Sequence, residues 1–142
     1  MTIAQALKEK NKKISKLQSL WDRLHRYNVV TEGEERPYSS KDTWEEISKL
    51  TTDIVVLKTK IHTASEPVRS KIFMLSELKN KAIRLKGLST NSGTHRDRYS
   101  EATIVSIPEF NVLWKDREVE QIESDIEKIQ EDLDKFNHTT EI

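Results

Sequence analysis

The sequence predicts an all-α protein, folded as an antiparallel bundle of four long helices with coiled-coil-like seams. Three observations lead to this prediction. Only 3 glycines and 3 prolines interrupt the 142 residues, so helix breakers are few. Hydrophobic residues make up 35% of the chain and charged residues 34%, which is typical of amphipathic helices with a narrow apolar stripe. Apolar residues also recur at alternating steps of three and four, the heptad spacing of helices that pack side by side.

The first two helices are expected over residues 2–27 and from near Ser40 or Asp42 onward. Thr2 is a plausible N-cap of the first helix, because its hydroxyl can accept a hydrogen bond from a free backbone N–H group. The first seam runs through Ile3, Leu7, Ile14, Leu17, Trp21 and Leu24. The second runs through Ile47, Leu50, Ile54, Leu57, Ile61 and Ala64.

A break at Ser65-Glu66-Pro67 separates the second helix from a third over residues 66–88, since proline suits the first turn of a new helix. Because this turn is short, we expect the second and third helices to form an antiparallel hairpin. Ser106 and Glu109 form a capping-box pattern with Pro108 between them, which predicts that the fourth helix starts there. Its seam follows at Val112, Val119, Ile122, Ile126, Ile129, Leu133 and Phe136.

Two long connections remain, residues 28–40 and 89–107, and the up-and-down order of the helices puts both at one end of the bundle. The β-branched run 103–105 predicts a short strand, which we expect to pair with residues 29–31. An acidic loop would then face an arginine-bearing loop, either as a salt-bridged lid or as a binding site. We expect Arg96 or Arg98 near a carboxylate of the first loop, in the same subunit or a neighbouring one. The candidate binding residues are Asn28, Glu32, Glu34, Arg96, Arg98 and Tyr99.

Charge is unevenly distributed although the formal net charge is zero. Residues 1–27 hold seven Lys or Arg and two acids, whereas residues 108–137 hold four and ten. Opposite charges attract over a Debye length of roughly 8 Å, so these two segments are expected to be neighbours, within or between subunits. In the alternative, the lysines of residues 8–13 meet an acidic partner or a phosphate backbone. The balanced total charge gives no reason to expect nucleic acid as a partner.

No motif commits the chain to a reaction, and we expect no enzyme, no catalytic residue, no metal and no cofactor. A di-iron bundle needs Glu-x-x-His on two helices, and the nearest pattern is one Asp22-x-x-His25. There is no nucleophile elbow and no glycine-rich phosphate loop. Zero Cys fits a reducing compartment, and the longest apolar run is four residues. The sequence therefore predicts a single cytoplasmic domain over residues 1–142 with no membrane association.

Five short motifs resemble a small bacterial helical family whose members are uncharacterised and often labelled septicolysin. They are NVVTEGEE at 28–35, KIHTAS at 60–65, IFMLSELKNKA at 72–82, RYS at 98–100 and FNHTTEI at 136–142. The resemblance covers most of the chain in the same order, although each motif is short. It implies an α-helical bacterial protein, and the family label implies a haemolysin.

These observations predict a non-enzymatic helical scaffold or protein-interaction module that acts as a homo-oligomer, at least a dimer. Apolar residues such as Val55, Val56 and Phe73 exceed the needs of one seam, and small helical proteins bury such residues against copies of themselves. An unidentified protein partner is a further expectation. Two alternatives stay open: a septicolysin-like cytolysin or membrane-active protein, and a small-ligand binding protein that uses the two long loops.

Overall fold

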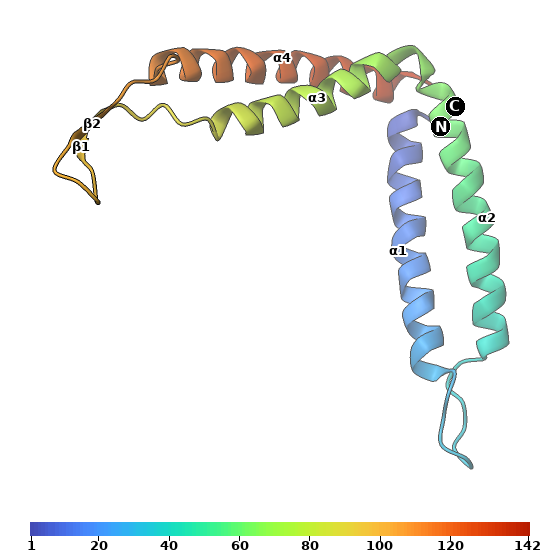
Figure 1. Cartoon of the computed structure of the whole chain (residues 1–142). Helices are drawn as coiled ribbons and strands as arrows, with labels where there is room; N and C mark the ends of the chain where they lie inside the picture. Colours follow the sequence, from blue (N-terminus) through green and yellow to red (C-terminus); the bar gives the residue numbers. More distant parts are fainter. The chain divides into compact units, whose positions relative to one another are not determined.

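A computed structural model describes all residues, 1–142, and the chain is mainly helical (Figure 1). The first half contains α1 (Ile3–Tyr27) and α2 (Ser40–Ala64), followed by a short 3₁₀ helix, η1 (Glu66–Val68). The second half contains α3 (Arg69–Lys86), the strands β1 (Gly93–Arg96) and β2 (Thr103–Ser106), and α4 (Val112–Thr139). The predicted helical class is confirmed, as are four α-helices and the break near Pro67.

The chain divides into two compact units. Unit 1 comprises residues 1–68 and 134–142, and unit 2 comprises residues 69–133. Unit 1 therefore contains α1, α2 and the end of α4, whereas unit 2 contains α3, the two strands and the rest of α4. The single domain and the four-helix bundle expected from the sequence stay predictions.

Unit 1 is organised around the contact between α1 and α2, which lie side by side (Figure 1). The buried hydrophobic cluster consists of Leu20 from α1 with Ile47, Leu50 and Ile54 from α2. Three partly buried residues of α1 pack against it: Leu17, Trp21 and Leu24. All of these residues except Leu20 belong to the two predicted seams, because apolar residues three and four positions apart lie on one helix face. Leu20 is buried on the same face of α1 although the predicted seam did not include it.

Side-chain caps fix the starts of both helices of unit 1. Thr2 accepts a hydrogen bond from the Gln5 backbone N–H, and the Gln5 side chain accepts one from the Thr2 N–H, at 3.2 and 2.8 Å. The predicted N-cap is thus confirmed, with a reciprocal capping box that satisfies two backbone donors. At α2 the Ser39 hydroxyl accepts from the Asp42 N–H at 3.1 Å, so the helix begins at Ser40.

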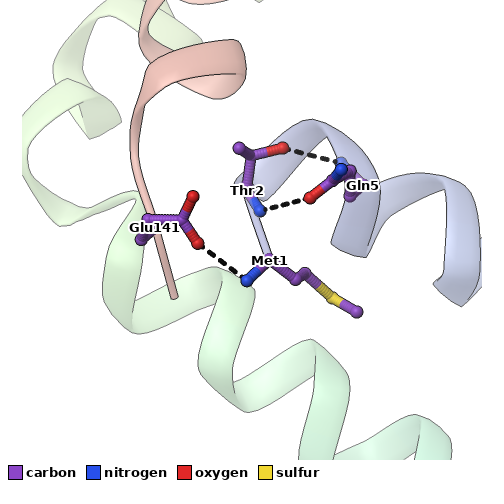
Figure 2. A network of polar contacts seen from close by, with 4 residues as sticks. All are labelled: Met1, Thr2, Gln5 and Glu141. Carbon is purple, nitrogen blue, oxygen red and sulfur yellow. Dashed lines mark hydrogen bonds and ion pairs between the residues drawn. The ribbon is translucent and has the colours of Figure 1, made fainter.

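The two ends of the chain pair with each other in unit 1 (Figure 2). The Ile3 N–H donates to the Thr140 carbonyl at 2.9 Å, and the Ile142 N–H donates to the Met1 carbonyl at 3.1 Å. The Met1 ammonium lies 2.7 Å from a Glu141 carboxylate oxygen. Ile3 is 1% exposed. The pairing thus supplies the backbone acceptor that the buried start of α1 requires.

Unit 2 is a hairpin of α3 and α4 held mainly by polar contacts (Figure 1). Lys71 pairs with Asp132 at 3.1 Å and Lys86 with Glu123 at 2.6 Å. The Lys115 ammonium donates to the Leu88 carbonyl at 2.8 Å, just beyond the end of α3. The buried hydrophobic residues of unit 2 are Ala82, Ile122 and Leu133. The rest of its apolar stripe is partly or fully exposed.

The predicted strand exists, but the predicted strand partner is wrong. Residues 103–106 pair antiparallel with residues 93–96, with His95 opposite Ile104, so both strands belong to the second loop. Residues 29–31 form no strand. The physical reason is proximity in sequence, since a hairpin closes a short loop at a smaller entropic cost than a pairing between distant loops.

The predicted start of α4 is also wrong. The helix begins at Val112, and the Asn111 side chain accepts a hydrogen bond from the Trp114 N–H at 2.9 Å. Asn111 is therefore the N-cap residue. Ser106 cannot take that role because it is the last residue of β2, where its backbone pairs with Gly93.

Candidate functional site

The six predicted site residues fall into both units. Asn28, Glu32 and Glu34 lie at or after the end of α1 in unit 1. Arg96 is the last residue of β1, Arg98 and Tyr99 lie in the hairpin loop that follows it in unit 2, and all three are exposed. Each set of three residues has a defined position within its own unit. The site that would join the two sets stays a prediction.

The first loop is fastened to the end of α1 by an arginine and a tyrosine. The Arg36 guanidinium donates to the carbonyl oxygens of Tyr27, at 2.7 Å, and Asn28. These carbonyls lie at the helix C-terminus, where they lack helical partners and attract a cation. Tyr38 packs its ring against Tyr27 and lies under the Arg23 guanidinium, 4.3 Å from its ring centre. The loop thus closes the helix end.

A hollow of about 510 Å³ adjoins this closure and is lined by Asn28, Arg36, Ser39, Ser40 and Lys41. Of the predicted site residues, Asn28 is the one that lines it. Glu32 is exposed in a turn closed by a hydrogen bond from the Glu34 N–H to the Thr31 carbonyl. Gly33 has a φ of 88° in that turn, a left-handed conformation that glycine adopts without a steric cost. The arginine of the hollow is engaged by backbone carbonyls, which leaves Lys41 as its other cationic group.

The hairpin loop of unit 2 is ordered by one carboxylate. Asp97 accepts hydrogen bonds from the Ser100 hydroxyl at 2.8 Å and from the Tyr99 N–H at 3.2 Å. These bonds hold the pKa of the Asp97 carboxyl below its ordinary value, because both favour the charged form. Tyr99 is 90% exposed. The hairpin therefore presents its aromatic and basic side chains to solvent without enclosing a ligand-sized space.

A larger cavity lies in unit 2, between α3 and α4, and is called the α3–α4 groove below. Its volume is about 580 Å³. Its α3 wall is lined by Glu77, Asn80, Lys81, Arg84 and Leu85, and by Leu88 just beyond the end of the helix. Its α4 wall is lined by Trp114, Glu118 and Ile122. Phe110 stacks on Trp114 at a ring-centre distance of 3.8 Å and fixes the indole at the end of the groove.

The groove has an apolar floor between rims of opposite charge. Leu85, Leu88, Trp114 and Ile122 supply the floor. Glu77, Lys81 and Arg84 stand on the α3 rim, which is therefore basic on balance, and Glu118 stands on the α4 rim. None of these four charged side chains forms an ion pair or a hydrogen bond within the chain. Unpaired charges around an apolar surface are typical of a protein interface, whose polar rim surrounds a hydrophobic centre.

No family model, curated protein or solved structure matches this chain. The candidate site is therefore argued from its own geometry. No group of three or more His, Asp or Glu side chains is placed to hold a metal ion. None of the four α-helices combines the length and the apolar character that crossing a bilayer requires.

The sequence analysis missed the residues that line the groove and the arginine that closes the first loop. The charges of the two helices did contain a signal for the groove. Helix α3 carries six Lys or Arg and one acidic residue, whereas α4 carries four Lys or Arg and nine acidic residues. A signal for Arg36 was weaker, since a single arginine after a helix does not indicate which carbonyls it reaches.

Proposed function

We propose that the protein is a non-enzymatic helical scaffold or interaction module that acts as a homo-oligomer. The observation that supports this proposal is the exposed apolar surface of unit 2. Phe73 is 63% exposed, Ile83 69% and Leu113 68%, and the α3–α4 groove adds an apolar floor. Exposed apolar side chains beside an apolar groove are typical of an interaction site.

The energetic argument favours a partner that covers the apolar lining of the α3–α4 groove. Burying a large aliphatic or aromatic side chain contributes about 1.5–3 kcal/mol, so several of them can offset the entropy lost on association. The exposed ion pairs that join α3 to α4 contribute only about 0–1 kcal/mol each. Unit 2 thus gains most of its stability when its apolar stripe is covered.

A second copy of the chain is the partner that requires no further assumption. Each copy carries the same exposed surface, and a two-fold axis buries both at once. The proposal includes the antiparallel four-helix bundle predicted from the sequence, with its helices contributed by more than one chain. It also includes the expected cytoplasmic location, which cell fractionation tests.

Multi-angle light scattering after size exclusion tests the proposal directly. The chain has a mass of 16.6 kDa. At micromolar concentration we expect a mass of two chains or a higher multiple. The mass of one chain over the whole range from about 1 to 100 µM, where interfaces of this kind associate, would reject the proposal.

A further inference from the structure

We infer that the α3–α4 groove is the self-association surface, and that it receives the α3–α4 hairpin of a second copy with α3 of each chain against α4 of the other. This inference rests on the proposed homo-oligomer and names its interface. Three observations support it: the charges of the two rims, the lack of intrachain partners for the charged rim side chains, and the register of α3 against α4.

The two rims of the groove complement each other across chains. Unpaired Lys81 and Arg84 outnumber Glu77 on the α3 rim and make it basic on balance, and unpaired Glu118 makes the α4 rim acidic. The two helices as a whole differ in charge in the same way. Helix α3 carries six basic residues and one acidic residue, whereas α4 carries four basic and nine acidic residues. An acidic or a basic partner would complement one rim and repel the other. A second copy complements both.

The direction of the two-fold axis follows from the same charges. When two grooves face each other across an axis parallel to the helices, each α3 lies against the partner's α4. An axis across the helices would instead place the basic α3 on the other α3 and the acidic α4 on the other α4. Like charges facing each other in an interface are unfavourable, so the parallel axis is selected. Every neighbouring pair of helices is then antiparallel, as in an up-and-down four-helix bundle.

The hairpin register sets which charges meet. The contacts of Lys71 with Asp132, of Lys115 with Leu88 and of Lys86 with Glu123 place Leu85 level with the stretch of α4 from Glu118 to residue 124. Rotation about an axis parallel to the helices leaves these heights unchanged. Arg84 and Lys81 therefore come level with the part of the partner's α4 that carries Glu118 and Asp125.

The apolar floor becomes the centre of this interface. Leu85, Leu88, Trp114 and Ile122 of both copies face each other across the axis, while the charged rims enclose them. A desolvated centre that contains a tryptophan and is surrounded by a polar rim has the composition of an energetic hot spot. The apolar residues supply the affinity, and the charges select the orientation.

Two charge-reversal variants, mixed with each other, test the inference. The first carries Lys81→Glu with Arg84→Glu, and the second carries Glu118→Lys with Asp125→Lys. In each variant alone, like charges face each other across the interface, so the dissociation constant should rise about 10- to 100-fold. In the equimolar mixture, acidic α3 meets basic α4 and the original pair is kept on the other side. We therefore expect a mixed dimer with close to wild-type affinity.

The matched control reverses two exposed lysines of α2, Lys58→Glu with Lys60→Glu, and should leave the dissociation constant unchanged. Circular dichroism confirms helix content, and the single reversals Arg84→Glu and Glu118→Lys repeat the mixing test if a double variant unfolds. Reversed variants that dimerise like the wild type, or that fail to recombine on mixing, would overturn the inference while the homo-oligomer stands. A monomeric wild type would overturn the homo-oligomer itself.

Discussion

The two helical hairpins of this protein differ in what holds them together. In unit 1, α1 and α2 bury a continuous line of aliphatic side chains, including Leu20, Ile47 and Ile54. In unit 2, α3 and α4 are joined by exposed ion pairs between lysines and carboxylates, and the side chains of Phe73 and Ile83 are exposed to solvent. Both hairpins are amphipathic and heavily charged. The comparison shows that an apolar stripe at heptad spacing does not say whether it is covered within the chain or outside it.

The difference has a thermodynamic meaning. A hairpin with a buried aliphatic seam gains its stability within one chain, because the transfer of apolar surface from water is completed on folding. A hairpin held by exposed ion pairs gains little from them, since such pairs contribute about 0–1 kcal/mol each. Unit 1 should therefore be stable at any concentration, whereas unit 2 should gain stability on association.

The largest effect is expected from the same substitution made in each unit. Ile47 of α2 is 2% exposed, so Ile47→Ala removes buried methylenes, leaves a cavity and should cost about 2–5 kcal/mol of unfolding free energy. Ile83 of α3 is 69% exposed and lies outside the α3–α4 groove, so Ile83→Ala should change it by no more than about 0.5 kcal/mol. Urea unfolding followed by circular dichroism measures both. Equal losses would mean that the two hairpins do not differ as described.

The pairing of the chain ends sharpens the account of unit 1. Deletion of residues 140–142 removes the carbonyl that accepts the Ile3 N–H and should cost about 1–3 kcal/mol. Glu141→Gln is the control, because it removes only an exposed ion pair and should cost no more than about 1 kcal/mol. The same unfolding measurement applies. A deletion that costs no more than Glu141→Gln would show that the ends contribute little.

The corrected start of α4 leads to a smaller effect in unit 2. Asn111→Ala removes the side-chain acceptor of the Trp114 N–H and should cost about 1 kcal/mol. Ser106→Ala, at the predicted but incorrect cap, should change stability by no more than about 0.5 kcal/mol. Thermal unfolding at one fixed protein concentration compares the two variants. A larger loss of stability for Ser106→Ala than for Asn111→Ala would favour Ser106 as the N-cap, as expected from the sequence.

The smallest effect is a titration in the exposed hairpin loop. The lowered pKa of Asp97 means that its hydrogen bonds stabilise the turn above the ordinary carboxyl pKa, and that this contribution is lost as the pH falls through the lowered pKa. Ser100→Ala removes the main cause and should move the pKa of Asp97 back toward its ordinary value. The chemical shift of the Asp97 carboxyl carbon, followed in an NMR pH titration, measures this pKa. An Asp97 pKa unchanged by Ser100→Ala would show that the hydroxyl does not act on it.

Much of the fold could be predicted because the signals are local. The cap at Thr2 and the seam through Ile47, Leu50 and Ile54 depend on residues within a few positions of each other. The start of α4 failed for a local reason too, since Ser106 and Asn111 are both suitable caps. The strand that ends at Ser106 decides between them, and its partner at residues 93–96 was not predicted.

The candidate site was harder to predict because it depends on how two helices face each other. Glu118 and Arg84 are ordinary surface charges until α3 and α4 are placed side by side with Trp114 between them. The charge balance was also compared only between residues 1–27 and residues 108–137, so the strongly basic character of α3 was missed. The predicted loop site, with residues such as Glu32 and Arg98, depends on opposite charges and on the expectation that both long loops lie at one end of the bundle. Neither indicates which groups meet.

Hydrogen–deuterium exchange at several protein concentrations tests the central claim most directly, because it reads both hairpins in one sample. If unit 2 is covered by a second copy, the amides of α3 and of residues 112–133 should exchange more slowly as the concentration rises through the dissociation constant. The amides of α1 and α2 should exchange at the same rate throughout. Protection of α3 and α4 that does not change with concentration would contradict the account.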